Sequence, residues 1–171
     1  WKEEDMTNSY IALDLETTGL EARLDKITEI AALRVEDGRV EERFVTLVNP
    51  GRQLGERITA LTGITDDMVK DAPVIEDTIG DVVRFCGNLP LLGHNILFDY
   101  AFLKRAAVNS GLDFEREGID PLGICRLFMP ADVKRNLTCA CSFYEVSQSA
   151  AHRAQADAEA AHRLYQVMMA R

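Results

Sequence analysis

Two carboxylates lie two residues apart at the end of an apolar segment. Asp14 and Glu16 follow the apolar residues 10–13 and precede Thr17-Thr18-Gly19. Alternate side chains of a strand point to the same face, so the two acids share a face. Like charges this close repel each other unless something positive lies between them. The pair therefore indicates either a strand end exposed to water or paired with an arginine, or a site for a divalent cation, which prefers carboxylate oxygens.

A third acid follows a second apolar segment. Leu89-Pro90-Leu91-Leu92-Gly93 is typical of a short buried strand, and a polar turn then leads into a helix whose first turn contains Asp99. The helix dipole favours a negative charge there, so helix stabilisation is one interpretation. Phe98 can either stack against a base or belong to the core. Taken alone, this stretch leaves both a structural and a functional role open.

The fourth acid, Asp157, lies among alanines near the start of the last predicted helix. Small neighbours let a helix pack closely on a sheet, which would bring Asp157 towards Asp14. A buried aspartate requires a partner or a metal ion. His152 precedes the helix by a few residues, and an imidazole that titrates near neutral pH suits a general base. An ordinary surface or capping histidine is the alternative.

The elements that must position these residues follow an α/β pattern. Segments rich in Ile, Val, Leu and Phe predict strands over 9–15, 27–36 and 39–48, with a hairpin turn at Glu36-Asp37-Gly38. Antiparallel strands followed by right-handed crossovers give a mixed sheet. The remaining expected elements are short helical turns over 56–71 with Thr65 as a cap, a helix over 74–86, a strand over 89–93, and helices over 98–108, 120–129, 136–145 (capped by Asn136) and 154–170.

Length and charge limit the kind of protein. The 171 residues suit a single domain over 1–171, with residues 1–8 as a flexible N-terminal segment. No apolar run reaches the roughly 20 residues of a membrane span, and we expect a cytoplasmic protein whose four cysteines are reduced thiols. A net charge of −9 argues against a long basic surface for nucleic acid. It permits an enzyme that binds a short end through metal ions, because bound cations reverse the local charge.

Taken together, the three stretches carry a family resemblance. D-x-E-T-T-G at 14–19, G-H-N-x-x-F-D at 93–99 and H-R-A-x-x-D-A at 152–158 resemble the motifs of the DEDDh group of 3′→5′ exonucleases. The likeness is closest to the proofreading exonuclease subunit or domain of bacterial DNA polymerase III. It runs from about Tyr10 to about Met169 and includes residues 48–51 and 61–65. It implies an RNase H-like fold, in which helices flank a five-stranded mixed sheet.

The resemblance also implies a site and a reaction. The enzyme would release nucleoside 5′-monophosphates from the 3′ end of DNA by a two-metal mechanism, with Mg²⁺ or Mn²⁺ as the ions. The implied catalytic residues are the metal ligands Asp14, Glu16, Asp99 and Asp157, with His152 to activate the attacking water. The implied substrate contacts are Thr17, Thr18, Leu61, Thr62, His94, Asn95 and Phe98.

The sequence departs from the family pattern in two places. Residues 52–56 lack the proline that commonly follows the Asn49-Pro50-Gly51 turn. Pro121 follows Asp120, and we expect it to loosen a helix start near the site. The sister DEDDy group has a tyrosine where Arg153 stands, so the chain fits the histidine variant only.

Other functions fit the same residues. An exoribonuclease that trims RNA or oligonucleotides is one, because contacts to the 2′-OH cannot be assigned from the sequence. A non-catalytic module that binds nucleic-acid ends in a polymerase assembly is another, but the presence of all four acids argues against it. A metal-binding fold with a small-molecule substrate is a third. The expected partner is a single-stranded 3′ end of DNA or RNA. The net charge of −9 favours a tether to a DNA polymerase, although a free-standing enzyme remains an alternative.

Overall fold

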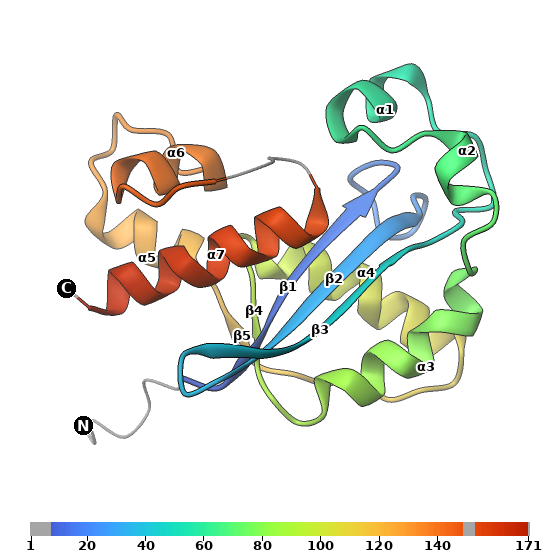
Figure 1. Cartoon of the computed structure of the whole chain (residues 1–171), viewed down its shortest axis with the longest axis horizontal. Helices are drawn as coiled ribbons and strands as arrows, with labels where there is room; N and C mark the ends of the chain where they lie inside the picture. Colours follow the sequence, from blue (N-terminus) through green and yellow to red (C-terminus); the bar gives the residue numbers. More distant parts are fainter. Residues whose placement is uncertain (1–7, 149–152, 171) are drawn as a thin grey trace.

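A five-stranded mixed sheet forms the centre of the computed structural model, which describes residues 8–148 and 153–170 (Figure 1). The strand order is β3-β2-β1-β4-β5. Strands β1 (Tyr10–Thr17), β2 (Ile27–Glu36) and β3 (Arg39–Leu47) form an antiparallel meander. Strands β4 (Leu91–Leu92) and β5 (Gly118–Ile119) are parallel to β1 and to each other. The predicted fold, an α/β arrangement of RNase H type, is confirmed.

The meander is long and turns where the sequence predicts. Asp37 and Gly38 have φ values of 51° and 78°, as a two-residue turn of type I′ requires between twisted strands. In the β1–β2 ladder Asp14 faces Ala31 and Glu16 faces Glu29. The register shifts between Glu16 and Thr17, so regular pairing ends next to the second acid.

Seven helices of the described residues surround the sheet. They are α1 (Glu56–Thr62), α2 (Asp66–Val69), α3 (Ile75–Cys86), α4 (Ile96–Asn109), α5 (Pro121–Phe128), α6 (Leu137–Phe143) and α7 (Ala154–Met169). The predicted caps are confirmed, because Thr65 Oγ1 accepts from the Met68 N–H at 3.3 Å and Asn136 Oδ1 accepts from the Cys139 N–H at 2.8 Å.

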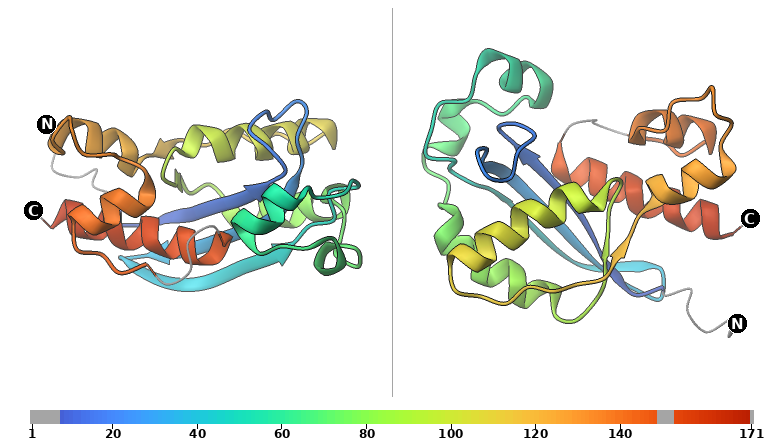
Figure 2. Two further views of the ribbon diagram at one scale, coloured as in Figure 1. Left: turned by 90° about the horizontal axis from the view of Figure 1, so that it is seen from above. Right: turned by 180° about the vertical axis from the view of Figure 1, so that it is seen from behind.

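The helices cover both faces of the sheet. Alternate β1 residues Ile11, Leu13 and Leu15 enter a core that includes residues of α3 and α4. Tyr10 and Ala12 face the other side, where they pack with residues of α7. Figure 2 shows α4 and α7 on opposite sides of the sheet. Asp14 and Glu16 continue the series that starts at Tyr10, so they point towards the α7 side.

Two expectations require correction. No residues were assigned to a fifth strand, and β5 escaped detection because it has only two residues, of which Gly118 is exposed. The expectation that Pro121 loosens a helix start is wrong. Pro121 occupies the first turn of α5, where its missing N–H costs nothing, and Asp120 caps that helix by accepting from the Leu122 N–H at 2.9 Å.

All four cysteines are free, and Cys86, Cys125 and Cys141 are buried. Across residues 8–148 and 153–170, the helices are too short or too polar to cross a bilayer.

Candidate active site

Three carboxylates meet where β1 passes the start of α7. One oxygen from each of Asp14, Glu16 and Asp157 lies within 4.8 Å of the others. Asp157 reaches this position because α7 presents alanines to the sheet. Ala154, Ala158 and Ala161 are buried against β1 and β2, and such small side chains allow a close approach. The sequence argument that alanines carry Asp157 towards Asp14 agrees with this packing.

Asp99 approaches the cluster from α4. It is buried in the first turn of that helix, and its Oδ1 accepts a hydrogen bond of 3.0 Å from the N–H of Leu15. Leu15 is the residue between the two acids of β1, so Asp99 is fixed to the backbone that carries them. The three-acid cluster therefore has a fourth carboxylate beside it rather than within it.

Gly93 explains why α4 can start so close to β1. A Cβ at this position would lie 2.8 Å from the Leu13 carbonyl oxygen and 2.8 Å from the Ile96 side chain. A residue larger than glycine would therefore push the His94–Asn95 turn, and with it the start of α4, away from the acids.

The acids repel one another inside the protein. Burial, with added repulsion from Asp99 and Asp157, raises the pKa of Asp14 well above its usual range. Burial and the neighbouring carboxylates raise the pKa of Glu16 to about 8. Burial also raises the pKa of Asp99 to about 8, against the lowering effect of its hydrogen bond from Leu15. Added positive charge would therefore stabilise the ionised form of these carboxylates.

This arrangement fits a hard divalent cation. Every donor in the cluster is a carboxylate oxygen, which Mg²⁺ and Mn²⁺ prefer. Asp14 Oδ2 is buried and has no hydrogen-bond partner among the described residues. A buried anionic oxygen without a partner is costly, and a cation removes that cost.

Two further side chains hold Asp157 and its helix, and the sequence argument missed both. Gln148 Nε2 donates to Asp157 Oδ1 at 3.0 Å. Glu29, only 3% exposed, accepts two hydrogen bonds from the Arg153 guanidinium and one from the Ala154 N–H. The available signal was a glutamate inside the apolar strand Ile27-Thr28-Glu29-Ile30, where a buried charge must be paired.

The substrate residues expected on β1 lie at the end of the strand that carries the acids. Thr17 and Thr18 are half-buried, and their hydroxyls order the loop that follows. Thr17 Oγ1 donates to the Gly19 carbonyl at 2.6 Å, and Thr18 Oγ1 donates to Asp25 Oδ1 at 3.3 Å. The two threonines thereby fix the backbone next to the cluster.

Leu61 and Thr62 lie on α1, which stands above the tip of β1 in Figure 1. Leu61 is 50% exposed, so its side chain is free to contact a base. Thr62 is buried, and its hydroxyl donates to the Ile58 carbonyl at 2.8 Å and accepts from the Ile64 N–H at 3.1 Å. The Thr62 hydroxyl therefore stabilises the end of α1 and the residues that follow it.

The turn before α4 is held by an acid that the sequence argument did not assign to the site. The Asp120 carboxylate accepts from the N–H groups of Asn95 and Ile96, at 2.9 and 3.2 Å, in addition to capping α5. Asn95 is exposed and adopts a φ of 63°. Phe98 is half-buried and packs with its ring centroid 5.0 Å from that of Phe102, so at least part of it belongs to the core.

His94 connects this turn to the segment before α6. Its Nε2 lies 2.6 Å from the Arg135 carbonyl oxygen, which fixes an N–H on that nitrogen. Its Nδ1 is buried without a partner among the described residues. Burial lowers the pKa of His94, so the ring is neutral near pH 7. His152, the expected general base, lies outside the described residues.

Comparison with known protein families shows the family to which the chain belongs. The sequence model of the exonuclease family RNase_T matches residues 11–165. The chain belongs to this exonuclease family. The resemblance to exonucleases found in the sequence is therefore confirmed.

Curated relatives of this exonuclease chain are much longer proteins. The DNA polymerase III PolC-type of Lacticaseibacillus paracasei is 39% identical over 152 residues, which are 88% of this chain and 10% of the polymerase. The corresponding protein of Bacillus subtilis is 38% identical over 155 residues, 89% of this chain and 11% of that protein. The exonuclease chain thus spans about a tenth of the length of the curated relatives it matches.

Solved exonucleases share its fold. E. coli exonuclease I in complex with a dT13 oligonucleotide matches 96% of this chain and 42% of its own, with a TM-score of 0.81 and 19% identity. Exonuclease X in complex with 5′ overhanging duplex DNA matches 92% of this chain and 90% of its own, with a TM-score of 0.69 and 26% identity. These likenesses agree with the RNase H-like arrangement of the exonuclease sheet.

Proposed function

We propose that this exonuclease domain removes nucleotides from the 3′ end of DNA by metal-dependent hydrolysis, as a proofreading exonuclease does. The observation that carries the proposal is the cluster of Asp14, Glu16 and Asp157, with a buried Asp14 oxygen that lacks a partner among residues 8–148 and 153–170. A structural ion pair would have provided a basic side chain at this oxygen. Phosphodiester hydrolysis instead uses carboxylates to gather divalent cations.

Asp14, Glu16, Asp99 and Asp157 would hold two ions, Mg²⁺ or Mn²⁺. When bound, these ions supply positive charge to the attacking and leaving oxygens of the phosphodiester. The protein contributes rigidity, because Asp14 and Glu16 lie on a central strand and Asp99 is hydrogen-bonded to the same strand. The carboxylates therefore need little rearrangement to receive cations, which favours a preorganised site.

We assign the general base to His152, on the motif match alone. Arg153, the next residue, is anchored to Glu29, so the segment that contains His152 joins a fixed helix start. Thr17 and Thr18 would offer their backbone to the terminal nucleotide, and Leu61 its exposed side chain to the terminal base. His94, Asn95 and Phe98 would form the opposite wall. Stacking against such a wall tolerates any base, which suits a proofreading activity.

We further propose that residues 1–171 form a single exonuclease domain that acts next to a DNA polymerase in the cytoplasm. The curated relatives are PolC-type polymerases of which this chain spans about a tenth. A domain with a net charge of −9 holds DNA weakly by itself, so a tether would supply the local concentration of substrate. The four free cysteines suit a reducing compartment.

The test is a nuclease assay that measures the direction of cleavage, the released product and the preference for DNA or RNA. A 5′-labelled single-stranded DNA should shorten from its 3′ end with Mg²⁺ or Mn²⁺, and the released product should be nucleoside 5′-monophosphate. A DNA duplex with a mismatched 3′ end should be shortened faster than the matched duplex, and RNA of the same sequence more slowly than DNA. Endonucleolytic fragments would contradict the exonuclease assignment, and faster cleavage of RNA would move the function to an exoribonuclease.

A further inference from the structure

A groove runs from the acid cluster along the connection between α5 and α6. Its volume is about 770 Å³, and both Asp14 and Asp157 lie on its wall. The rest of the wall comes from the His94–Asn95 turn, from α5, from residues 131–138, and from Gln148 and Ala161. Thr17, Thr18 and Leu61 are not part of this wall, whereas His94 and Asn95, which are also proposed to contact the terminal nucleotide, belong to it. The groove therefore begins beside the proposed terminal-nucleotide site and extends away from it along residues 131–138.

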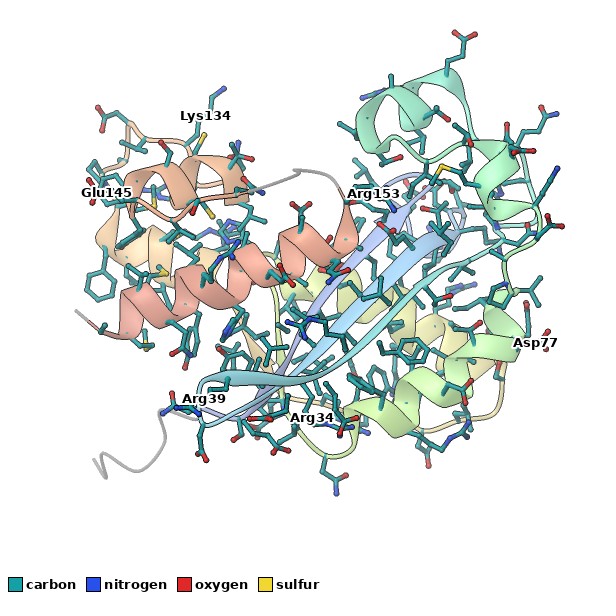
Figure 3. All side chains as sticks on the ribbon, in the orientation of Figure 1. Arg34, Arg39, Asp77, Lys134, Glu145 and Arg153 are labelled. Atoms are coloured by element: carbon teal, nitrogen blue, oxygen red, sulfur yellow. The ribbon has the colours of Figure 1, made fainter. Side chains whose placement is uncertain are left out.

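The far part of the groove is basic. Arg126 of α5, together with Lys134 and Arg135 of the following connection, lines it, and Asp132 is the acid of that connection. Arg126 and Lys134 are exposed, and within residues 8–148 and 153–170 neither forms an ion pair. Figure 3 shows Lys134 on the connection that precedes α6, with its side chain directed into solvent. In a chain of net charge −9, this is a local reversal of sign beside the reaction site.

The basic connection is fixed relative to the acids. The Arg135 carbonyl oxygen lies 2.6 Å from His94 Nε2, and His94 follows directly after Gly93 at the end of β4. Arg135 Nε, a buried donor of the groove, lacks a hydrogen-bond partner among the described residues, while Arg135 Nη2 donates to the Met129 carbonyl oxygen at 3.5 Å. This unused donor, together with the exposed Arg126 guanidinium and Lys134 ammonium groups, is suited to phosphate oxygens.

We propose that this groove binds the phosphates of the substrate strand on the 5′ side of the scissile bond, with Arg126, Lys134 and Arg135 as the contacts. The proposal rests on the proposed exonuclease function. It adds the path that the substrate strand follows upstream of the scissile bond. Contacts to the backbone position a strand without reading its bases, as an enzyme that removes any nucleotide requires. The positive charge of the groove would also explain how a domain with a net charge of −9 binds a polyanion.

The test uses substrates of increasing length. The p-nitrophenyl ester of thymidine 5′-monophosphate has no upstream nucleotide, thymidine dinucleotide has no phosphate upstream of the scissile one, and (dT)8 has several. For the wild-type protein, KM should fall from dinucleotide to octanucleotide. With Arg126→Ala or Lys134→Ala, KM for (dT)8 should rise about five- to tenfold, as for loss of one charge-assisted contact. The loss should be at least about fivefold larger for (dT)8 than for the ester.

Two further variants separate the groove from general electrostatics. Asp132→Asn removes the negative charge of the same connection and should lower KM for (dT)8, which is the opposite sign. Arg39→Ala removes an exposed charge at the far end of the sheet, where Figure 3 labels it, and should leave both substrates unchanged. Each lost contact should also reduce the slope of log(kcat/KM) against log[salt] by about 0.7.

The outcomes distinguish this proposal from the function on which it rests. If the wild-type protein cleaves all three substrates while Arg126→Ala and Lys134→Ala keep its KM and salt slope on (dT)8, the groove proposal is wrong and the exonuclease function stands. An equal loss on ester and octanucleotide also overturns the groove proposal. If the wild-type protein cleaves none of them with Mg²⁺ or Mn²⁺, both proposals fail together.

Discussion

Glu29 and Arg153 form an ion pair that joins the second strand of the sheet to the start of the last helix. Arg153 Nη2 lies 2.7 Å from Glu29 Oε2, and Arg153 Nε lies 3.1 Å from Glu29 Oε1. The same Oε1 accepts from the Ala154 N–H at 2.8 Å. Glu29 is also the cross-strand neighbour of Glu16. A single buried carboxylate therefore fixes where α7 begins, one turn before Asp157.

Glu29→Gln should weaken both the fold and the site. The amide keeps the size of the side chain but removes the charge that pairs with Arg153, whose own side chain is 40% exposed. We expect a loss of about 1–3 kcal/mol in the free energy of unfolding, less than for a fully buried pair because Arg153 retains contact with water. Nuclease kcat should fall by at least about tenfold, because Asp157 loses its fixed position. Urea unfolding and initial rates measure the two effects.

Glu42→Gln is the matched control for that substitution. Glu42 pairs with Arg34 at 2.7 Å, but its side chain is 59% exposed. Removing this charge should cost less than about 0.5 kcal/mol and leave nuclease activity unchanged. If the two variants lost equal stability and equal activity, the Glu29–Arg153 pair would have no special role in positioning α7.

Asp14→Asn should separate stability from function. The amide removes one of several buried carboxylates that repel one another, so the metal-free protein should become more stable by about 1 kcal/mol or more at pH 8, which is roughly 2–4 °C in Tm. Nuclease activity should fall by at least about 10³-fold, because the site loses a cation ligand. Thermal unfolding in EDTA and single-turnover cleavage rates provide the two readouts.

The control for Asp14→Asn is Asp81→Asn, which removes an exposed charge of α3 that pairs with Arg84. It should leave the metal-free Tm within about 1 °C of the wild-type value and leave cleavage intact. A metal-free Asp14→Asn protein less stable than the wild type would contradict the account of the cluster as mutually repelling anions.

The stability of the metal-free protein should decrease as pH rises. The pKa values of Glu16 and Asp99 are raised to about 8, so the folded state binds protons that the unfolded state has already released. Their stabilising contribution is complete below the ordinary carboxyl pKa and is lost as pH rises through about 8, at up to about 1.4 kcal/mol per pH unit for each group. Thermal unfolding in EDTA between pH 5 and 8.5 measures this slope.

Metal ions and one substitution should change that slope in a defined way. Saturating Mn²⁺ stabilises the folded state more at pH 8 than at pH 5, because carboxylates must be deprotonated to bind it. Glu16→Gln in EDTA should show a shallower decrease than the wild type, because one of the carboxyl groups with a raised pKa is absent. An unchanged slope in Glu16→Gln would assign the pH dependence to other groups.

Asp120→Ala should disturb the site through the backbone. Three N–H groups, those of Asn95, Ile96 and Leu122, would lose their acceptor. We expect a cost of about 2–3 kcal/mol in unfolding free energy, and a raised KM because the His94–Asn95 turn is loosened. Asn136→Ala removes a cap with one hydrogen bond, to the Cys139 N–H, and should cost only about 1 kcal/mol.

The sequence predicts much of the fold because the relevant signals are local. Segments rich in Ile, Val, Leu and Phe define the meander, and Asp37-Gly38 defines its turn. Alanines around Asp157 predict a helix close to the sheet. The two-residue strand β5, Gly118–Ile119, is too short to form such a segment. Its place is set by pairing with β4, a contact between residues far apart in the chain.

The residue types of the candidate site indicate its chemistry, but they do not reveal which residues hold the acids in place. Four acids at the ends of three predicted elements indicate a cation site from the sequence alone. The roles of Glu29, Asp120 and Gln148 depend on which distant backbone or side chain each one meets. Pro121 illustrates the same point, because its effect depends on whether it falls inside a helix or in the first turn.

The most direct test of the account is restoration of cleavage by metal. The wild-type protein, stripped with EDTA and then dialysed free of it, is given a 5′-labelled single-stranded DNA with increasing Mg²⁺ or Mn²⁺. We expect no cleavage before metal is added, and then a ladder that shortens from the 3′ end, with Asp157→Asn inactive at every metal concentration. Cleavage by the stripped protein, or full activity of Asp157→Asn, would contradict the central claim that these carboxylates form a catalytic metal site.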